Sequence, residues 1–301
     1  MYNFRRNYSL SASSAPDERS PMKVLITGSG GKTGCLVLKK LLEKGDAFSV
    51  RGLVRTEQSA GKLANETNLS KDSIFVADVT QGPEALAEAM SGCEAVVLCT
   101  SAVPKLILWS LFPVLWSRLT GKGGVRPRFR YAEGQSPEAV DWVGARAQID
   151  AAAAAGARKF VFLGSMGGTQ TEENFLNTMG GGNVLLWKRK AEEHLIRSGL
   201  DYTIIHAGRL TDDEGGKRDI VLGVDDELIA AGIPREKRET PRADFAELAV
   251  QSLLLPEASN RSVDMVTRER PEGSGPTDFR RLFEEMRADC DYSISGRPPT
   301  I

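Results

Sequence analysis

The chain alternates short apolar runs, rich in β-branched residues, with stretches whose apolar residues recur every three or four positions. The first pattern predicts buried strands and the second predicts amphipathic helices. We expect strands at 23–27, 48–54, 73–77, 95–99, 159–163 and 202–206, and helices at 35–44, 83–90, 136–155 and 184–198. Continuous apolar strands that alternate with helices indicate right-handed crossovers and a parallel sheet covered on both faces. The sequence therefore predicts a doubly wound α/β fold.

After residue 207, the alternation of apolar runs and amphipathic stretches becomes less regular. Strands are expected near 219–224 and 262–267 and helices near 242–254 and 277–288, which we interpret as a small C-terminal lobe. The main domain is predicted to span residues 22–290, followed by a flexible tail at 291–301. Residues 1–21 are rich in serine and include Arg5 and Arg6, which fits either a disordered arm or the remnant of a transit peptide.

A long insertion at 103–135 separates the fourth strand from the helix that begins near Ser136. Its apolar run, 106–116, contains two tryptophans and Pro113, and it is shorter than the roughly 18 residues that a membrane span needs. Long segments of this kind are often lids or binding loops. Three interpretations stay open: the insertion closes over a substrate pocket, it contacts a partner or a membrane surface, or it has no function.

The composition narrows the function classes. The chain is 41% hydrophobic and 26% charged, which is ordinary for a globular protein. Its formal net charge of -1 gives no electrostatic reason to expect a nucleic-acid partner. The four cysteines form no CxxC pair and there are only two histidines, so we expect neither a disulfide framework nor a metal site.

The segment GSGGKTG, residues 28–34, lies between the first predicted strand and the first predicted helix. Unpaired amides at the start of a helix suit a pyrophosphate, and glycines let the backbone turn sharply and approach the phosphates closely. A triphosphate P-loop is excluded, because its first glycine would have to stand at Ile26. We therefore expect a dinucleotide to contact Gly28, Ser29, Gly30, Gly31, Lys32, Thr33 and Gly34.

The residue that follows the second strand indicates which dinucleotide binds. NAD binders carry an acidic residue there for the ribose 2′-hydroxyl, whereas this chain has Arg55. A guanidinium can hold a 2′-phosphate, and Lys32 could add a second cation, which favours NADP(H) over NAD(H). The alternative is that both are solvated surface charges. By position, the adenine and the cofactor backbone would lie near Asp78, Val79, Thr100, Ser101 and Ala102.

Taken together, the motifs resemble the NmrA-like atypical short-chain dehydrogenase/reductases, and especially a plant and algal subgroup of NAD(P)-binding proteins, many of them plastid-targeted. The resemblance implies a Rossmann-like sheet and a location in the plastid stroma or the cytoplasm. It covers most of residues 22–270. The resembling segments are VLITGSGGKTG (24–34), RGLVRT (51–56), TSAVP (100–104), AVDWVGARAQIDAA (139–152), GSMGGT (164–169), WKRKAEEHL (187–195) and GLDYTIIHAGRL (199–210).

The resemblance also implies a serine, tyrosine and lysine set. Ser165 matches the serine that polarises a substrate carbonyl, and Lys188 matches the lysine that bonds the nicotinamide ribose. The tyrosine that exchanges the substrate proton belongs four residues before that lysine, where this chain has Val184. A well-placed acid or base is worth roughly 10²–10⁴ in rate, and valine supplies neither.

The missing tyrosine leaves two functions open. One is an NADP(H)-dependent oxidoreductase of atypical mechanism that acts on a small carbonyl or enone, with its proton supplied by Tyr131, another group or water. The other is a non-catalytic NADP(H)-binding protein that senses redox state or scaffolds an assembly. His206 stands where many relatives in the resembling family carry an arginine, and we interpret it as a packed strand-end residue. The substrate is not assigned.

Overall fold

The computed structural model describes residues 20–121, 124–169, 174–229, 234–273 and 275–294. Most of the N-terminal segment 1–21 and the end of the predicted tail lie outside these ranges. Residues 291–294, predicted as the start of the tail, are bonded to the body of the protein. The amide of Asp291 donates to Asp225, and the hydroxyl of Tyr292 donates to Glu192. The predicted boundary at 290 therefore falls within an anchored segment.

An eight-stranded sheet forms the centre of the molecule, in the order β10-β12-β8-β7-β4-β1-β2-β3. Every neighbouring pair is parallel except β10 with β12. The chain runs outward from β1 through β2 to β3 on one side, and the later strands continue on the other side. This reversal next to β1 creates a crevice at the carboxyl ends of the strands, where ligands of such sheets bind. The strands are β1 (Met22–Thr27), β2 (Phe48–Val54), β3 (Ile74–Val76), β4 (Ala95–Leu98), β7 (Lys159–Ser165), β8 (Asp201–Ala207), β10 (Arg218–Gly223) and β12 (Arg261–Glu269).

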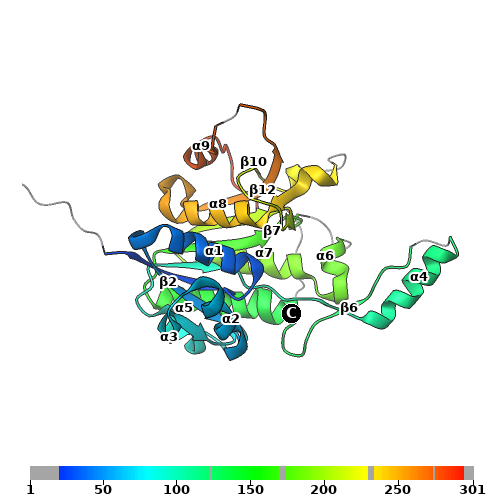
Figure 1. Ribbon diagram of the computed structural model, residues 1–301, viewed down its shortest axis with the longest axis horizontal. Coiled ribbons are helices and arrows are strands. Elements are labelled where there is room, and N and C mark those ends of the chain that lie inside the picture. Colours follow the sequence, from blue (N-terminus) through cyan, green and yellow to red (C-terminus); the bar gives the residue numbers. More distant parts are fainter. Residues whose placement is uncertain (1–19, 122–123, 170–173, 230–233, 274, 295–301) are drawn as a thin grey trace, which may run out of the picture.

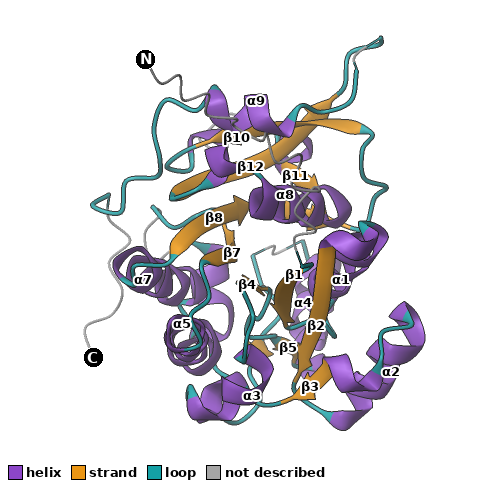
Figure 2. Cartoon of the chain, turned by 90° about the vertical axis from the view of Figure 1, so that its left-hand side faces the viewer, coloured by secondary structure: helices purple, strands orange, loops and turns teal. Residues whose placement is uncertain are grey.

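Helices cover both faces of the sheet, which confirms the doubly wound α/β fold (Figure 2). One face is covered by α1 (Lys32–Glu43), α2 (Glu57–Thr67) and α8 (Arg242–Leu254), and the other by α3 (Ala87–Met90), α5 (Ala145–Ala154) and α7 (Val184–Arg197). Each face has its own hydrophobic core: Leu38 and Leu41 of α1 are fully buried on the first, and Ile149 and Leu195 on the second. A π-helical turn, Glu138–Gly144, leads into α5.

The C-terminal lobe continues the main sheet. Strand β12 pairs with β8, and α9 (Phe279–Glu284) buries Phe283 in the same core as α1 and α8. Short elements complete the fold: β9 (Arg209–Thr211), β11 (Glu239–Pro241) and α6 (Phe175–Thr178). Helix α2 was not predicted, because its mostly polar sequence buries only Leu63.

The insertion forms an arm that projects from the body (Figure 1). Strands β5 (Lys105–Leu106) and β6 (Phe129–Arg130) pair at its base, and α4 (Leu111–Leu119) lies at its outer end. Within the described residues, no helix is long and apolar enough to cross a membrane.

Candidate cofactor and active site

The glycine loop is pressed between the end of β4 and the start of α1. Gly28 has a φ of 66°, and a Cβ there would lie 2.9 Å from the carbonyl carbon of Cys99. A Cβ on Gly34 would lie 2.4 Å from the carbonyl oxygen of Gly28. The buried Ser29 hydroxyl donates to the carbonyl of Leu53 at 3.0 Å and ties the loop to β2. These contacts require glycine at both positions, so the loop has one tight path.

The first turn of α1 is open to an anion. Gly31 is the N-cap residue, no side chain caps the helix, and the first turn holds no acidic residue. Gly30, Gly31 and Lys32 are exposed. Uncapped amides and the positive end of the helix dipole favour a bound phosphate. The loop therefore fits the pyrophosphate of a dinucleotide.

Arg55 directly follows β2 and is exposed at the rim of the crevice. Its guanidinium donates to the side-chain oxygen of Gln135, and the Gln135 amide donates to Asp78 at 2.9 Å. Asp78 also accepts hydrogen bonds from the amide and hydroxyl of Thr80. The predicted residues Arg55 and Asp78 are thus joined through Gln135, which no sequence pattern had indicated.

Two hydroxyl groups at the start of α2 lie beside Arg55 and the glycine loop. The Thr56 hydroxyl caps α2 by accepting from the Ser59 amide at 3.2 Å, and the two hydroxyl oxygens are 2.9 Å apart. A Cβ on Gly30 would lie 3.4 Å from Cβ of Ser59. Sequence reasoning missed both residues because it missed α2, although Thr-x-x-Ser after a strand is a helix-capping pattern.

Lys32 points elsewhere. Its ammonium lies 2.5 Å from Asp212, which also pairs with Arg242. The first turn of α1 is formed by Lys32, Thr33 and Gly34, which are among the predicted cofactor residues. For Lys32 to reach a phosphate, this exposed ion pair would have to open.

The buried carboxylate of Asp141, in the π-helical turn, gathers several predicted site residues. It lies 2.8 Å from the ammonium of Lys188, and it accepts hydrogen bonds from the Ser101 hydroxyl at 2.8 Å and the Ala102 amide at 3.1 Å. The side chains of Asp141 and Lys188 are 0% and 8% exposed. We call these four residues the Asp141 cluster. It fixes the end of β4 and the lysine together at the crevice.

Two further contacts extend the Asp141 cluster. Gln148 of α5 donates to the hydroxyl of Thr100 at 3.1 Å. A Cβ on Gly144 would lie 2.8 Å from a methyl of Val79, so the π-helical turn packs tightly on that residue. Sequence reasoning named Ser101 and Lys188 but not Asp141, because no local pattern shows that Asp141 contacts Ser101, 40 residues earlier, and Lys188, 47 residues later.

Ser165 lies at the end of β7, opposite Ala207 of β8. Its half-buried hydroxyl bonds to the carbonyl of Met166 at 3.3 Å, and within the described chain it makes no hydrogen bond to Lys188. The loop that follows is held by Asp226, which accepts from the amides of Gly167 and Thr169 at 2.5 and 2.9 Å. Ser165 thus lies outside the Asp141 cluster.

The position of the family tyrosine, Val184, is the first residue of α7. Tyr131 lies near this helix start: a Cβ on Gly182 would be 2.9 Å from the Tyr131 hydroxyl. That hydroxyl donates to the carbonyl of Met179 at 3.2 Å. Burial and the negative charge of Asp141 raise the pKa of Tyr131, so it releases its proton less readily than a free tyrosine. The environment therefore does not activate Tyr131.

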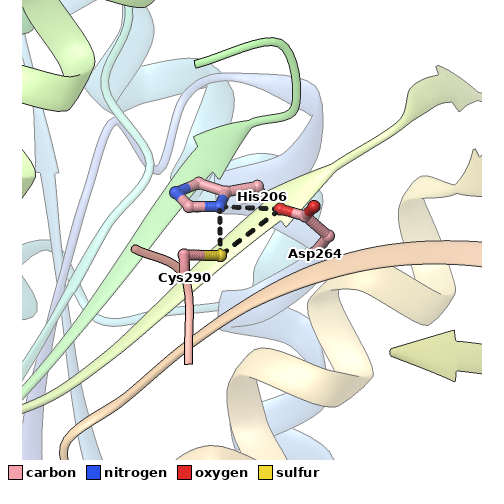
Figure 3. Close-up of side chains that lie close together, drawn as sticks. All are labelled: His206, Asp264 and Cys290. Carbon is pink, nitrogen blue, oxygen red and sulfur yellow. Dashed lines mark hydrogen bonds and ion pairs between the residues drawn. The ribbon is translucent and has the colours of Figure 1, made fainter. Parts of the chain in front are cut away.

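His206 belongs to a second buried charge cluster, and Figure 3 shows it beside Asp264 and Cys290. Its Nδ1 lies 3.0 Å from Asp264 and its Nε2 lies 3.1 Å from Glu192, while the sulfur of Cys290 is 3.7 Å from Nδ1. We call these four residues the His206 cluster. Gly164 permits this packing, because a Cβ there would lie 2.8 Å from both Glu192 and the imidazole.

The charge state of His206 decides what this cluster can do. Burial alone would lower the pKa of His206, but the charge of Glu192 and the hydrogen bond with Asp264 outweigh it and raise the pKa well above 6.5. Both ring nitrogens then carry protons and donate to carboxylates. His206, Asp264 and Cys290 lie close enough to surround a metal ion, and the same three side chains also hydrogen-bond to one another. The cluster is a set of paired buried charges.

The comparisons with known proteins agree with this geometry. A family model described as NAD(P)H-binding matches residues 28–256. The chain belongs to this NAD(P)H-binding family. An uncharacterised chloroplastic protein of Arabidopsis thaliana is 44% identical over 91% of this chain and 78% of its own length. Sanguinarine reductase of Eschscholzia californica is 40% identical over 90% of this chain and 98% of its own length.

A solved structure from Bacillus halodurans, described as related to the NAD-dependent epimerases/dehydratases, covers 88% of this chain and 100% of its own, with a TM-score of 0.62 and 21% identity. That likeness concerns the fold. The family model and the plant relatives identify the chain as an atypical short-chain dehydrogenase/reductase of the plant subgroup, as the sequence motifs predicted. The family is NAD(P)-binding and reductase-like.

Proposed function

We propose that this family member is an oxidoreductase that uses NADP(H). The observation that carries the proposal is the group of donors beside the glycine loop: Arg55 directly follows β2, and the hydroxyls of Thr56 and Ser59 lie at the start of α2. A guanidinium binds a phosphate through charge-assisted hydrogen bonds, and hydroxyls and the positive end of α2 can complete the shell. NAD(H) carries a neutral hydroxyl at this position and would gain little from Arg55.

The Asp141 cluster supports a place for the nicotinamide ribose. An ammonium has three N–H donors, and among the described residues Lys188 pairs with one carboxylate, that of Asp141. We propose that its remaining donors bond the ribose hydroxyls and that the Ser165 hydroxyl donates to the substrate oxygen. When bound, the reduced nicotinamide supplies the hydride.

The residues at positions 184 and 131 favour substrates whose reduction needs no proton from an acidic side chain of the protein. Val184 cannot donate a proton, and Tyr131 holds its own tightly. Hydride addition to the β-carbon of an enone leaves the electron pair in an enolate, which Ser165 can stabilise until water protonates the α-carbon. A ketone would instead give a far more basic alkoxide that needs its proton at once. We therefore propose small enones as the preferred substrate class, ahead of simple ketones.

Turnover of matched substrates tests this proposal. Purified protein is mixed with NADPH and a panel of enones and their saturated ketones, and loss of NADPH absorbance is followed. We expect faster enone reduction, and a decrease in kcat of about a hundredfold in Ser165→Ala. The control is Ser70→Ala, which removes an exposed hydroxyl between α2 and β3 and should leave kcat unchanged.

A non-catalytic NADP(H) sensor or scaffold is the second candidate, and Val184 is the observation that favours it. Binding of NADPH without turnover on any member of the panel would refute the oxidoreductase and support this candidate. We also propose a plastid location, because the relative with 44% identity is chloroplastic. A fluorescent fusion of the full chain that stays in the cytoplasm would contradict that location.

A further inference from the structure

The arm carries a helix whose apolar side chains face away from the protein. Six large apolar residues of α4 and the turn before it are 62 to 79% exposed and recur at intervals of three and four, so that they share one face. Trp109 and Phe112 stack on each other with ring centroids 5.6 Å apart. We call this face the apolar stripe; its members are Leu108, Trp109, Phe112, Leu115, Trp116 and Leu119.

The inner face of the same segment is small and polar. Ser110 and Ser117 are 8% and 6% exposed. The Ser110 hydroxyl donates to the carbonyl of Ile107 at 2.6 Å and accepts from the amide of Arg128 at 2.8 Å, which fastens the helix to the returning strand. A helix that packs on its own protein normally buries its apolar face. Here the pattern is reversed, and exposed patches of this kind mark interaction surfaces.

Figure 1 shows that α4 lies at the outer end of the arm, away from the sheet. The stripe therefore does not cover the glycine loop or the Asp141 cluster, and a lid over the substrate pocket is not supported. The described residues of the chain leave the stripe exposed.

The charges around the stripe are all positive. From residue 103 to residue 132 the sequence contains no aspartate or glutamate. The arm carries Lys105, Arg118, Arg126, Arg128 and Arg130, all exposed, together with Lys122, which lies outside the described residues. None of the five described cations forms an ion pair within 4.0 Å with a described residue. A chain with a net charge of -1 thus concentrates positive charge at this one place.

We propose that the arm binds the surface of an anionic lipid bilayer, with the apolar stripe at the boundary between headgroups and acyl chains and the cations on the headgroups. Surface-bound helices combine these two signals, and tryptophan is favoured at this depth because it has a large apolar ring and one polar N–H group. The helix has nine residues, which corresponds to about 14 Å, so it lies in the interface plane. The inference is independent of the cofactor and of the reaction.

Vesicle binding of the full chain tests the proposal. The lipids are equal parts phosphatidylglycerol and phosphatidylcholine in one sample and phosphatidylcholine alone in the other, and bound protein is measured by co-sedimentation. We expect binding to the anionic vesicles that weakens with salt, and much weaker binding to the neutral ones. The double variant Trp109→Ser/Trp116→Ser should bind the anionic vesicles at least about tenfold more weakly.

Two further variants separate the apolar and the electrostatic contributions to vesicle binding. Leu254→Ser removes an exposed apolar residue at the end of α8, outside the arm, and should bind like the wild type. Arg118→Ser/Arg128→Ser should weaken binding to the anionic vesicles only. Insertion should also shift the tryptophan fluorescence to the blue, and the double tryptophan variant should lose this shift, because Trp187 is buried and Trp142 packs beneath Lys190.

Two results would overturn the proposal. One is wild-type protein that stays in solution with anionic vesicles at low salt, and the other is a double tryptophan variant that binds as well as the wild type. Dimers that form without lipid and disappear in the double variant would assign the stripe to a second copy of the chain. NADPH binding is measured for every variant, to check that its fold is intact.

Discussion

Helix α7 contributes to two buried charge clusters. The clusters differ in how many N–H donors of their cation already pair with a described residue of the protein. Lys188, in the Asp141 cluster, pairs with one carboxylate among the described residues. One turn further, Glu192 belongs to the His206 cluster, where both imidazole nitrogens engage carboxylates and the Tyr292 hydroxyl also donates to Glu192. The first cluster lies at the end of β4, and Cys290 and Tyr292 of the C-terminal segment contact the second.

This difference shows how buried cations can serve either ligand binding or the stability of the fold. A buried ammonium with remaining donors is suited to a ligand that arrives later, whereas an imidazolium whose two donors are both used has nothing left to offer. The His206 cluster therefore joins α7, β8, β12 and the C-terminal segment, and we propose that the Asp141 cluster binds the cofactor.

The largest expected effect is on stability at His206. His206→Ala leaves the carboxylates of Glu192 and Asp264 buried without their cation, and we expect a loss of about 3–5 kcal/mol in the free energy of unfolding. Urea unfolding at constant pH measures it. The control is His194→Ala, which removes a partly exposed histidine paired with Asp150 and should cost at most about 1 kcal/mol. Equal losses of unfolding free energy in the two variants would show that the His206 cluster does not stabilise the fold in this way.

The same cluster predicts a pH dependence. The pKa of His206 is raised in the folded protein above 6.5, so its stabilisation is fully present below about pH 6.5 and is lost as the pH rises through the folded pKa. The difference in unfolding free energy between wild type and His206→Gln should therefore shrink above pH 6.5, by about 1.4 kcal/mol per pH unit at most. A difference that grows with pH would contradict a charged His206.

A smaller effect is expected at the Asp141 cluster, and on binding. Asp141→Asn keeps the shape of the side chain but removes the charge that positions Lys188, so NADPH should bind about tenfold more weakly. Fluorescence titration measures this affinity. Asp150→Asn, an exposed change on the neighbouring α5, should leave it unchanged. If both variants bind NADPH like the wild type, Lys188 does not contact the cofactor.

Much of the fold could be predicted because its signals are local. The runs that became β1, β2, β4, β7 and β8 are short, apolar and bounded by polar turns, and the glycine loop lies where a strand meets a helix. The place of Arg55 directly after β2 was predicted in the same way, and its role in cofactor binding stays a prediction. Helix α2 escaped prediction because eleven mostly polar residues carry almost no apolar period.

The contacts within the site could not be predicted, because they depend on residues far apart in the sequence. Ser101 and Lys188 meet at Asp141 from 40 and 47 residues away, and His206 meets Asp264 and Cys290 across 58 and 84 residues. Only the fold brings them together. The arm is a related case: its apolar run was visible in the sequence, but the outward direction of the stripe depends on the Ser110 contact with Arg128.

The central claim is that Arg55 and the start of α1 receive a dinucleotide with a 2′-phosphate, and calorimetric titration with NADPH and NADH tests it most directly. We predict that NADPH binds at least about tenfold more tightly than NADH, that Arg55→Ala removes most of this difference with little change in NADH affinity, and that Arg118→Ala in the arm changes neither affinity. Equal losses of NADPH and NADH affinity in Arg55→Ala, or no binding of either dinucleotide at millimolar concentration, would contradict it.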